Sequence, residues 1–198
     1  MDKIAAIKRV CELKQACLSC RNCILCENIV DGLDPHVYAC GNIASPIIFL
    51  AESPGLTETQ QKIPLIGKAG QVFKKYILGG LGLKREDVWI SNCCLCRPPE
   101  NRKPTPEERA ACLPHLLAQF DLLKPELVVV LGATPMAVML DIETGITKLA
   151  GQKFRSQKFN VDVFVLPHPS FILRTGQYDL LIDYINKLKP LIYNIVDG

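Results

Sequence analysis

The chain has 198 residues, which is enough for one well-filled core but short for two domains of typical size, so we expect a single domain spanning residues 1–198. Hydrophobic residues make up 48% of the chain and charged residues 22%, which argues against extended disorder. The formal net charge of +3 excludes a histone-like chain but allows a local phosphate-binding patch.

The N-terminus lacks the unbroken apolar core of a secretory signal, and no stretch reaches the ~18 apolar residues of a membrane span. We therefore expect an intracellular protein that does not bind membranes. The chain has ten cysteines. In a reducing compartment these favour a metal or cluster site over a disulfide framework.

The first segment, residues 2–16, spaces apolar side chains at helical intervals between Lys and Glu residues, which predicts an amphipathic helix. The apolar positions are Ile4, Ile7, Val10, Cys11 and Ala16. Residues 17–45 are rich in cysteine and also contain Gly32, Pro35 and Gly41, a composition typical of a cluster-binding loop followed by an irregular connection.

Four short apolar runs follow, each with the length and composition of a buried strand. They span 46–51, 88–92, 127–132 and 161–166. Helical patterns occur at 68–82, 106–123, 134–141 and 178–195. Thr105 is the predicted N-cap of the second of these helices, with Pro106 in the first turn and Glu108 three residues on. Strands that alternate with helices indicate an α/β domain with a parallel sheet.

Polar side chains lie at the ends of three of the predicted strands. Glu52 lies at the start of a Pro-Gly turn, which can expose backbone N–H groups to an oxygen-rich ligand. Asn92 offers one acceptor and two donor hydrogens, and His168 lies between two prolines that favour extended backbone. Each of these alone is also compatible with an ordinary turn. Because open α/β sheets bind ligands at the carboxyl ends of their strands, the combination predicts a site there.

The cysteines form two groups in the sequence. The first repeats every three residues and consists of Cys17, Cys20, Cys23 and Cys26; the second is the pair Cys96 and Cys112. Four thiolates at such spacing bind either zinc or an iron-sulfur cluster, so spacing leaves the metal open. Burial as a small apolar side chain is a plausible role for the remaining cysteines, Cys11, Cys40, Cys93 and Cys94.

Four sequence blocks resemble the family 4 uracil-DNA glycosylases, occur in that family's order and together extend the resemblance over nearly the whole chain. They are Ala51-Glu52-Ser53-Pro54-Gly55, the stretch Pro64–Gly70, the stretch Ser91–Pro99 and the stretch His168–Arg174. The segment from Cys96 through Asn101-Arg102 and Pro104 to Cys112 also keeps the family's cysteine spacing. The resemblance implies a three-layer α/β/α sandwich with a four-stranded parallel central sheet and an N-terminal cysteine-rich segment.

The resemblance also implies a [4Fe-4S] cluster rather than zinc, formed by residues 17–26 together with 96–112. The implied ligands are Cys20, Cys23, Cys96 and Cys112. Cys20-Arg21-Asn22-Cys23-Ile24-Leu25 fits the family's Cys-x-x-Cys-x-Leu pattern, whereas Cys17 and Cys26 offer shifted registers.

The implied activity is that of a monofunctional glycosylase in base excision repair, which flips uracil out of single- or double-stranded DNA and hydrolyses the N-glycosidic bond, leaving an abasic site. Glu52 is expected to position the attacking water, and His168 to donate a hydrogen bond to uracil O2. Asn92 is expected to read the O4 and N3 edge of the base. Ser53 and Gly55, through nearby backbone amides, and Leu65 complete the expected uracil site.

The expected DNA contacts come from the last block. Ser170 belongs to this surface, Ile172 and Leu173 are expected to form an apolar wedge that fills the vacated base stack, and Arg174 is expected to hold a phosphate. We expect a monomer in the cytoplasm, associated with the nucleoid.

The chain departs from the family pattern at four positions that we expect to lie in the pocket. Leu65 stands in place of a phenylalanine, a change that forfeits base stacking worth ~1–3 kcal/mol. Thr59 stands in place of an aspartate, Ala51 in place of a glycine, and Ser53 in place of a small alanine or glycine. Two alternatives therefore remain, a non-catalytic iron-sulfur DNA-binding module and a glycosylase with a different target base. A zinc-bound nucleic-acid protein is a third.

Overall fold

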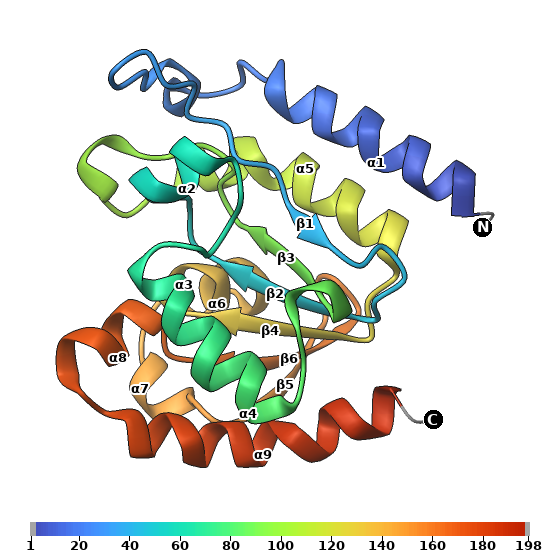
Figure 1. The fold of residues 1–198 in the computed structure, drawn as a ribbon, viewed down its shortest axis with the longest axis vertical. Coiled ribbons are helices and arrows are strands. Elements are labelled where there is room, and N and C mark those ends of the chain that lie inside the picture. Colours follow the sequence, from blue (N-terminus) through green and yellow to red (C-terminus); the bar gives the residue numbers. More distant parts are fainter. Residues whose placement is uncertain (1–2, 197–198) are drawn as a thin grey trace.

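The computed structural model describes residues 3–196, and Figure 1 shows a central sheet flanked by helices. The strands are β1 Cys40–Gly41, β2 Ile47–Ala51, β3 Trp89–Asn92, β4 Leu127–Leu131, β5 Lys153–Ser156 and β6 Val161–Leu166. The helices are α1 Lys3–Leu18, α2 Leu56–Gln61, α3 Lys68–Val72, α4 Gly79–Leu81, α5 Pro106–Leu123, α6 Ala133–Leu140, α7 Ile146–Leu149, α8 Pro169–Thr175 and α9 Tyr178–Val196. A π-helical stretch, Phe73–Leu78, joins α3 to α4.

The six-stranded sheet has the order β1-β3-β2-β4-β6-β5. The four inner strands pair in parallel, and they are the four apolar runs predicted from the sequence. The expectation of a four-stranded, wholly parallel sheet is wrong in one respect, because β1 and β5 pair antiparallel at the two edges. These edge strands give little sequence signal, since β1 has two residues and β5, Lys-Phe-Arg-Ser, is short and mostly polar.

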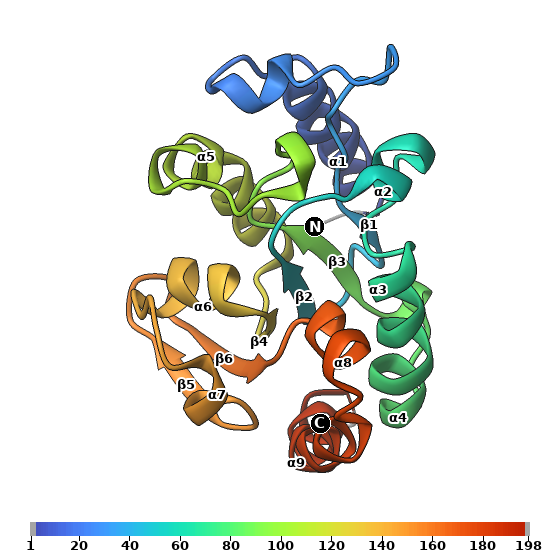
Figure 2. The same ribbon diagram turned by 90° about the vertical axis from the view of Figure 1, so that its left-hand side faces the viewer.

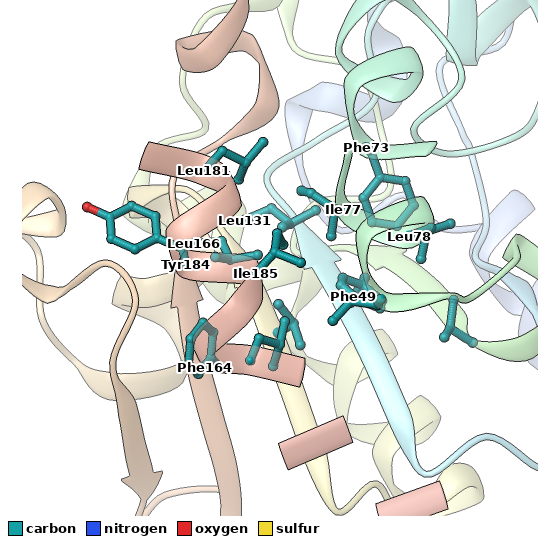
Figure 3. Close-up of a cluster of buried hydrophobic side chains, with 14 of the residues drawn as sticks. Phe49, Phe73, Ile77, Leu78, Leu131, Phe164, Leu166, Leu181, Tyr184 and Ile185 are labelled. Carbon is teal, nitrogen blue, oxygen red and sulfur yellow. The ribbon is translucent and has the colours of Figure 1, made fainter. Parts of the chain in front are cut away.

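Each face of the sheet is covered by helices with their own apolar core (Figure 2). One core joins alternate residues of β2 and β4 to α9 and the π-helical stretch. Figure 3 shows Phe49 of the sheet beside Phe73 and Ile77, with Tyr184 and Ile185 of α9 across the cluster. The other core joins the opposite residues of the strands to α1, α5 and α6. Residues buried on both faces explain why the inner strands are continuous apolar runs without alternation.

Helix α1 forms where the spacing predicts it, but the predicted buried face is wrong. Ile4 is 76% exposed and Ile7 is 50% exposed, whereas Ala6, Leu13 and Cys17 are buried. Leu13 and Cys17 pack in the core that α1 shares with α5. The helix therefore docks on its Leu13 side, and its N-terminal isoleucines lie outside the contact.

The predicted start of α5 is confirmed in detail. The Thr105 side chain accepts a hydrogen bond from the Glu108 backbone N–H at 3.2 Å, and the Glu108 carboxylate accepts one from the Thr105 N–H at 2.8 Å. Arg102 also pairs with Glu108 and holds the pKa of this buried carboxyl below its ordinary value. The cap thus orders the loop before α5. Among the described residues, no helix is long and apolar enough to cross a membrane.

Candidate functional site

The carboxyl ends of the parallel strands form one wall of a pocket of about 370 Å³. The register aligns these ends, because Ala51 pairs with Asn92 and Leu131 pairs with Leu166. Seven of the predicted site residues line the pocket: Glu52, Ser53, Gly55, Leu65, Asn92, His168 and Ser170. The expectation that separate strand ends meet at one site is therefore confirmed in the structure.

Asn92 ends β3 and is only 2% exposed. Its Nδ2 has no hydrogen-bond partner among residues 3–196. An unpaired buried amide costs ~1–3 kcal/mol, so this group requires a partner such as a water molecule or a ligand. The pocket therefore offers a buried donor to a ligand oxygen.

His168 is the N-cap of α8 and is partly buried. Its Nδ1 accepts a hydrogen bond from the Ser170 backbone N–H at 3.2 Å and lies 2.7 Å from Ser170 Oγ. A backbone N–H can only donate, so the neutral ring carries its proton on Nε2. Burial lowers the pKa of His168 to about 4, which keeps the imidazole neutral near pH 7. His168 is thus a neutral hydrogen-bond donor at the pocket.

Glu52 follows β2 and is held by a residue that sequence reasoning missed. Thr134, in the first turn of α6, donates its hydroxyl hydrogen to Glu52 Oε2. Thr134 is fully buried and Glu52 is partly buried. This contact orients the carboxylate and leaves Oε1 for a water or substrate.

Glu58 of α2 orders the opposite wall of the pocket. Its Oε1 accepts hydrogen bonds from the Ile66 and Gly67 backbone N–H groups at 3.0 and 2.8 Å. Its Oε2 accepts one from the Gly55 N–H at 3.2 Å. The Gly55 amide is therefore engaged by Glu58, so the expected assistance from backbone amides near Ser53 and Gly55 would have to come from other N–H groups of this turn.

Leu65 lines the pocket in a left-handed conformation, with φ of 52°. Arg85 donates to the Leu65 carbonyl at 2.9 Å and to the Pro64 carbonyl at 2.6 Å. A Cβ on Gly70 would lie 2.2 Å from the Leu65 carbonyl oxygen, so only glycine fits at position 70 without a shift. The strained turn is thereby held from two sides.

The residues of the block His168–Arg174 are divided between the apolar core and the protein surface. Ile172 is 0% exposed and belongs to the apolar core, so it cannot form the expected wedge. Leu173 is 42% exposed, and Arg174 is exposed with its guanidinium 5.9 Å from the Phe171 ring centre. Leu173 and Arg174 do not line the pocket itself.

A second cavity collects the cysteines. Its lining includes Cys17, Cys20, Cys23, Cys26, Cys94, Cys96 and Cys112. The two sequence groups of cysteines therefore come together in space as predicted, with Cys94 in addition. Within residues 3–196, no group of three or more His, Cys, Asp or Glu side chains is arranged as a metal ion would require. The choice among these thiols thus stays a prediction.

The thiols of this cavity influence one another electrostatically. Burial, with the nearby Cys112 and Cys20, raises the pKa of Cys17 to about 12. A hydrogen bond from Cys94 lowers the pKa of Cys112, and burial raises that of Cys96. A metal ion binds the deprotonated thiolates. Its positive charge would offset the desolvation cost of burying these negative groups. The donor set is one that either zinc or a thiolate-ligated iron-sulfur cluster can use.

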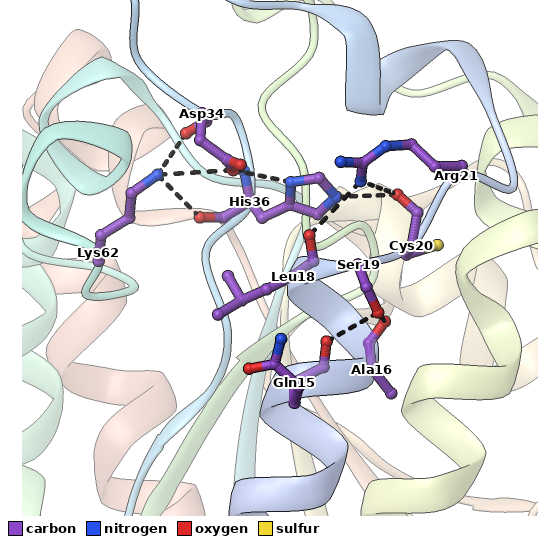
Figure 4. Close-up of polar contacts among 9 residues, drawn as sticks. All are labelled: Gln15, Ala16, Leu18, Ser19, Cys20, Arg21, Asp34, His36 and Lys62. Atoms are coloured by element: carbon purple, nitrogen blue, oxygen red, sulfur yellow. Dashed lines mark hydrogen bonds and ion pairs between the residues drawn. The ribbon is translucent and has the colours of Figure 1, made fainter.

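The cysteine segment is tied to the pocket wall by the polar contacts in Figure 4. The His36 ring lies 2.7 Å from Asp34 Oδ1 and 3.3 Å from the Cys20 carbonyl oxygen. Lys62, the C-cap of α2, donates to the Asp34 carbonyl and, at 3.2 Å, to the His36 carbonyl. Since α2 carries Glu58, these contacts link the cysteine segment to the pocket.

Comparison with known proteins identifies the family. The family model described as "Uracil DNA glycosylase superfamily" matches residues 39–189. A "Type-4 uracil-DNA glycosylase" of Thermotoga maritima is 39% identical over 158 residues, which are 77% of this chain and 80% of that protein. The chain belongs to the uracil-DNA glycosylase superfamily.

Further relatives within this superfamily carry the same name. The "Type-4 uracil-DNA glycosylase" of Archaeoglobus fulgidus is 35% identical over 72% of this chain and 74% of its own length. That of Pyrobaculum aerophilum is 33% identical over 68% of this chain and 71% of its own length. The family model begins at residue 39, so the run of four N-terminal cysteines precedes the matched region.

Of the four departures from the glycosylase pattern, two line the pocket and two do not. Leu65 and Ser53 line the pocket, as expected. Thr59 does not, because it is buried in α2 and its hydroxyl donates to the Gly55 carbonyl at 2.9 Å. Ala51 is buried in β2 within the core. The expectation that all four changes lie in the pocket is therefore wrong for Thr59 and Ala51.

Two residues of this glycosylase-like site escaped the sequence analysis. Thr134 had a usable signal, since it follows the end of the third predicted strand, where polar groups gather. Arg85 had none, because its two carbonyl partners are 20 and 21 residues away in the chain.

Proposed function

We propose that the protein is a DNA-repair enzyme, a monofunctional uracil-DNA glycosylase that hydrolyses the N-glycosidic bond and leaves an abasic site. The observation that carries the proposal is the pairing of two donors in one pocket, the unpaired Nδ2 of Asn92 and the neutral imidazole of His168. Uracil has two carbonyl oxygens that two such donors can bind. The names of the relatives point to the same activity.

His168 stabilises the leaving base in this mechanism. Breaking the bond between C1′ and N1 leaves negative charge on uracil and positive charge on the sugar. The Nε2–H donates to uracil O2, where the negative charge develops, and Asn92 binds the O4 and N3 edge. Removing one such donor costs ~2.7–4 kcal/mol, or about 10²–10³ in rate.

Glu52 acts on the opposite charge. Its carboxylate favours the cationic sugar electrostatically and positions the attacking water. Thr134 is a positioning residue, because its buried hydroxyl holds one carboxylate oxygen.

The DNA contacts of the proposal surround the pocket. Leu173 is the wedge, because it is exposed where Ile172 is buried. Arg174 contacts a phosphate, and Ser170 contributes at the pocket edge. We propose a monomer that binds single- or double-stranded DNA and consists of one domain over residues 1–198.

The proposed cofactor is a [4Fe-4S] cluster held by Cys20, Cys23, Cys96 and Cys112, with Cys17 and Cys26 as alternatives. Its chemistry is structural, since the glycosylase step transfers no electrons. Bound by these cysteines, the cluster would connect the N-terminal segment to the loop that follows Asn92, and the Lys62 contacts connect that segment to α2. Leu25 and Leu95 supply apolar lining to the cavity.

The test is uracil release by anaerobically purified protein from single-stranded, U:A and G:U oligonucleotides. His168→Ala and Asn92→Ala should each reduce release by about 10²–10³. Asn186→Ala, an exposed amide on α9, is the matched control and should not change it. Release that is unaffected by the His168 and Asn92 changes would refute the proposed site.

Leu65 motivates the second candidate, a glycosylase with a different target base or a module that binds DNA without cleaving it. An aliphatic wall replaces the expected aromatic one in the pocket. Base release from other damaged oligonucleotides, or DNA binding without release of any base, would favour these readings.

A further inference from the structure

The cysteine cavity contains more thiols than one cubane cluster uses. Four of the seven lie on one short segment, Cys17, Cys20, Cys23 and Cys26, whereas α5 brings only Cys112. A four-iron cluster needs four thiolates in total, and the loop after β3 and α5 supply two of them by the proposed ligand set. The N-terminal segment therefore offers four thiols for two positions.

All four cysteines line the same cavity as Cys96 and Cys112. Cys26 packs directly in a small cluster with Cys94 and Cys96, against which Cys23 and Cys112 also lie.

The backbone of this segment is irregular beyond α1. Only local turns follow the helix, with Cys20 N–H donating to the Cys17 carbonyl at 3.1 Å and Cys26 N–H to the Cys23 carbonyl at 3.3 Å. A 3₁₀ turn covers Ile24–Glu27. No strand pairing fixes the register of Cys20, Cys23 and Cys26, whereas Cys17 lies in the last turn of α1 and packs in its core. Beyond α1, the contact of the Cys20 carbonyl with His36 and the hydrogen bond from Asn28 to the Arg97 carbonyl are the bonds that a shift of three residues would break, in addition to the local turns.

We propose that Cys17, Cys20, Cys23 and Cys26 are interchangeable cluster ligands, so that a neighbouring thiolate takes the place of one that is lost. Cys112 has no second cysteine of the cavity on its own helix, and its hydrogen-bonded neighbour Cys94 lies on the loop that already supplies Cys96. This inference rests on the proposed cluster. It predicts an asymmetry, in which the cluster tolerates any one change in the N-terminal run but depends on Cys112.

The experiment measures iron, zinc and acid-labile sulfide per chain, with the absorbance near ~400 nm typical of thiolate-ligated iron. The four single Cys→Ser variants of the run are compared with the triple variant Cys17→Ser/Cys20→Ser/Cys23→Ser and with Cys112→Ser. Cys11→Ser and Cys40→Ser are matched controls, since neither thiol lines the cavity. Far-UV circular dichroism reports whether each variant is folded.

Each single variant of the run should keep iron and sulfide within about twofold of the parent, whereas the triple variant and Cys112→Ser should lose at least about tenfold. If one folded single variant held as little iron and sulfide as the triple variant, the inference would be overturned and that cysteine identified as a fixed ligand. Full retention by the triple variant would also overturn it. Parent protein with zinc or no metal would instead refute the cluster, and this inference with it. If Cys112→Ser fails to fold, the triple variant remains the reference.

Discussion

Thr134 offers the sharpest test of how the pocket is organised. Thr134→Val keeps the shape of the side chain and removes the hydroxyl that donates to Glu52 Oε2. Valine also suits the surroundings, because Thr134 is fully buried. The change therefore isolates one hydrogen bond, and the fold should survive it.

The size of the effect follows from the charge and burial of the pair. A hydrogen bond to a charged group contributes ~1.5–3 kcal/mol, which corresponds to about 10–150-fold in rate if all of it acts in the transition state. Glu52 is only partly buried, so water can replace the lost donor and the lower end of this range applies. We expect kcat to fall by about tenfold.

Single-turnover uracil release gives the rate, and titration of DNA containing a non-cleavable uracil analogue gives the affinity. Thr134→Val should slow release with little change in DNA affinity or Tm, and Thr134→Ser should restore most of the rate. If Thr134→Val cleaves as fast as the parent, Thr134 does not position Glu52. If valine and serine are equally slow, the hydroxyl is not the cause.

Three further predictions concern the pocket. Burial holds the pKa of His168 at about 4, below its ordinary 6.5. The stabilisation from its neutral ring is therefore complete above pH 6.5 and is lost as the pH falls toward 4. Between pH 7 and pH 4, the Tm of His168→Asn should fall less than that of the parent. A parallel fall in the two proteins would contradict this. Leu65→Phe should restore base stacking worth ~1–3 kcal/mol and tighten binding of uracil-containing single strands, and unchanged or weaker binding would show that the pocket has no room for the ring. Gly70→Ala should destabilise the fold by ~1–3 kcal/mol, because the added Cβ clashes with the Leu65 carbonyl. Gly79→Ala is the control and should not destabilise the fold, since its added Cβ would lie 3.5 Å from the nearest atom. Equal Tm values for the two variants would refute the close contact at Gly70.

The sequence determined those features that depend on local pattern. The inner strands are buried on both faces, so their apolar runs are visible without knowledge of their partners. The cap at Thr105 involves residues three apart and is equally local. Glu52, Asn92 and His168 lie at strand ends. Because the carboxyl ends of parallel strands lie at one edge of the sheet, the sequence was enough to predict that these residues share one pocket.

Only the tertiary structure decided features that depend on which surfaces meet. Helical spacing gave α1 an apolar stripe through Ile4, but docking on α5 buries the Leu13 side instead. Ile172 and Leu173 are adjacent and alike in sequence, yet the packing of α8 puts one in the core and the other at the surface. Thr134 meets Glu52 across 82 residues, a pairing that no local pattern encodes. Such contacts arise from the geometry of packed elements, which a linear pattern does not contain.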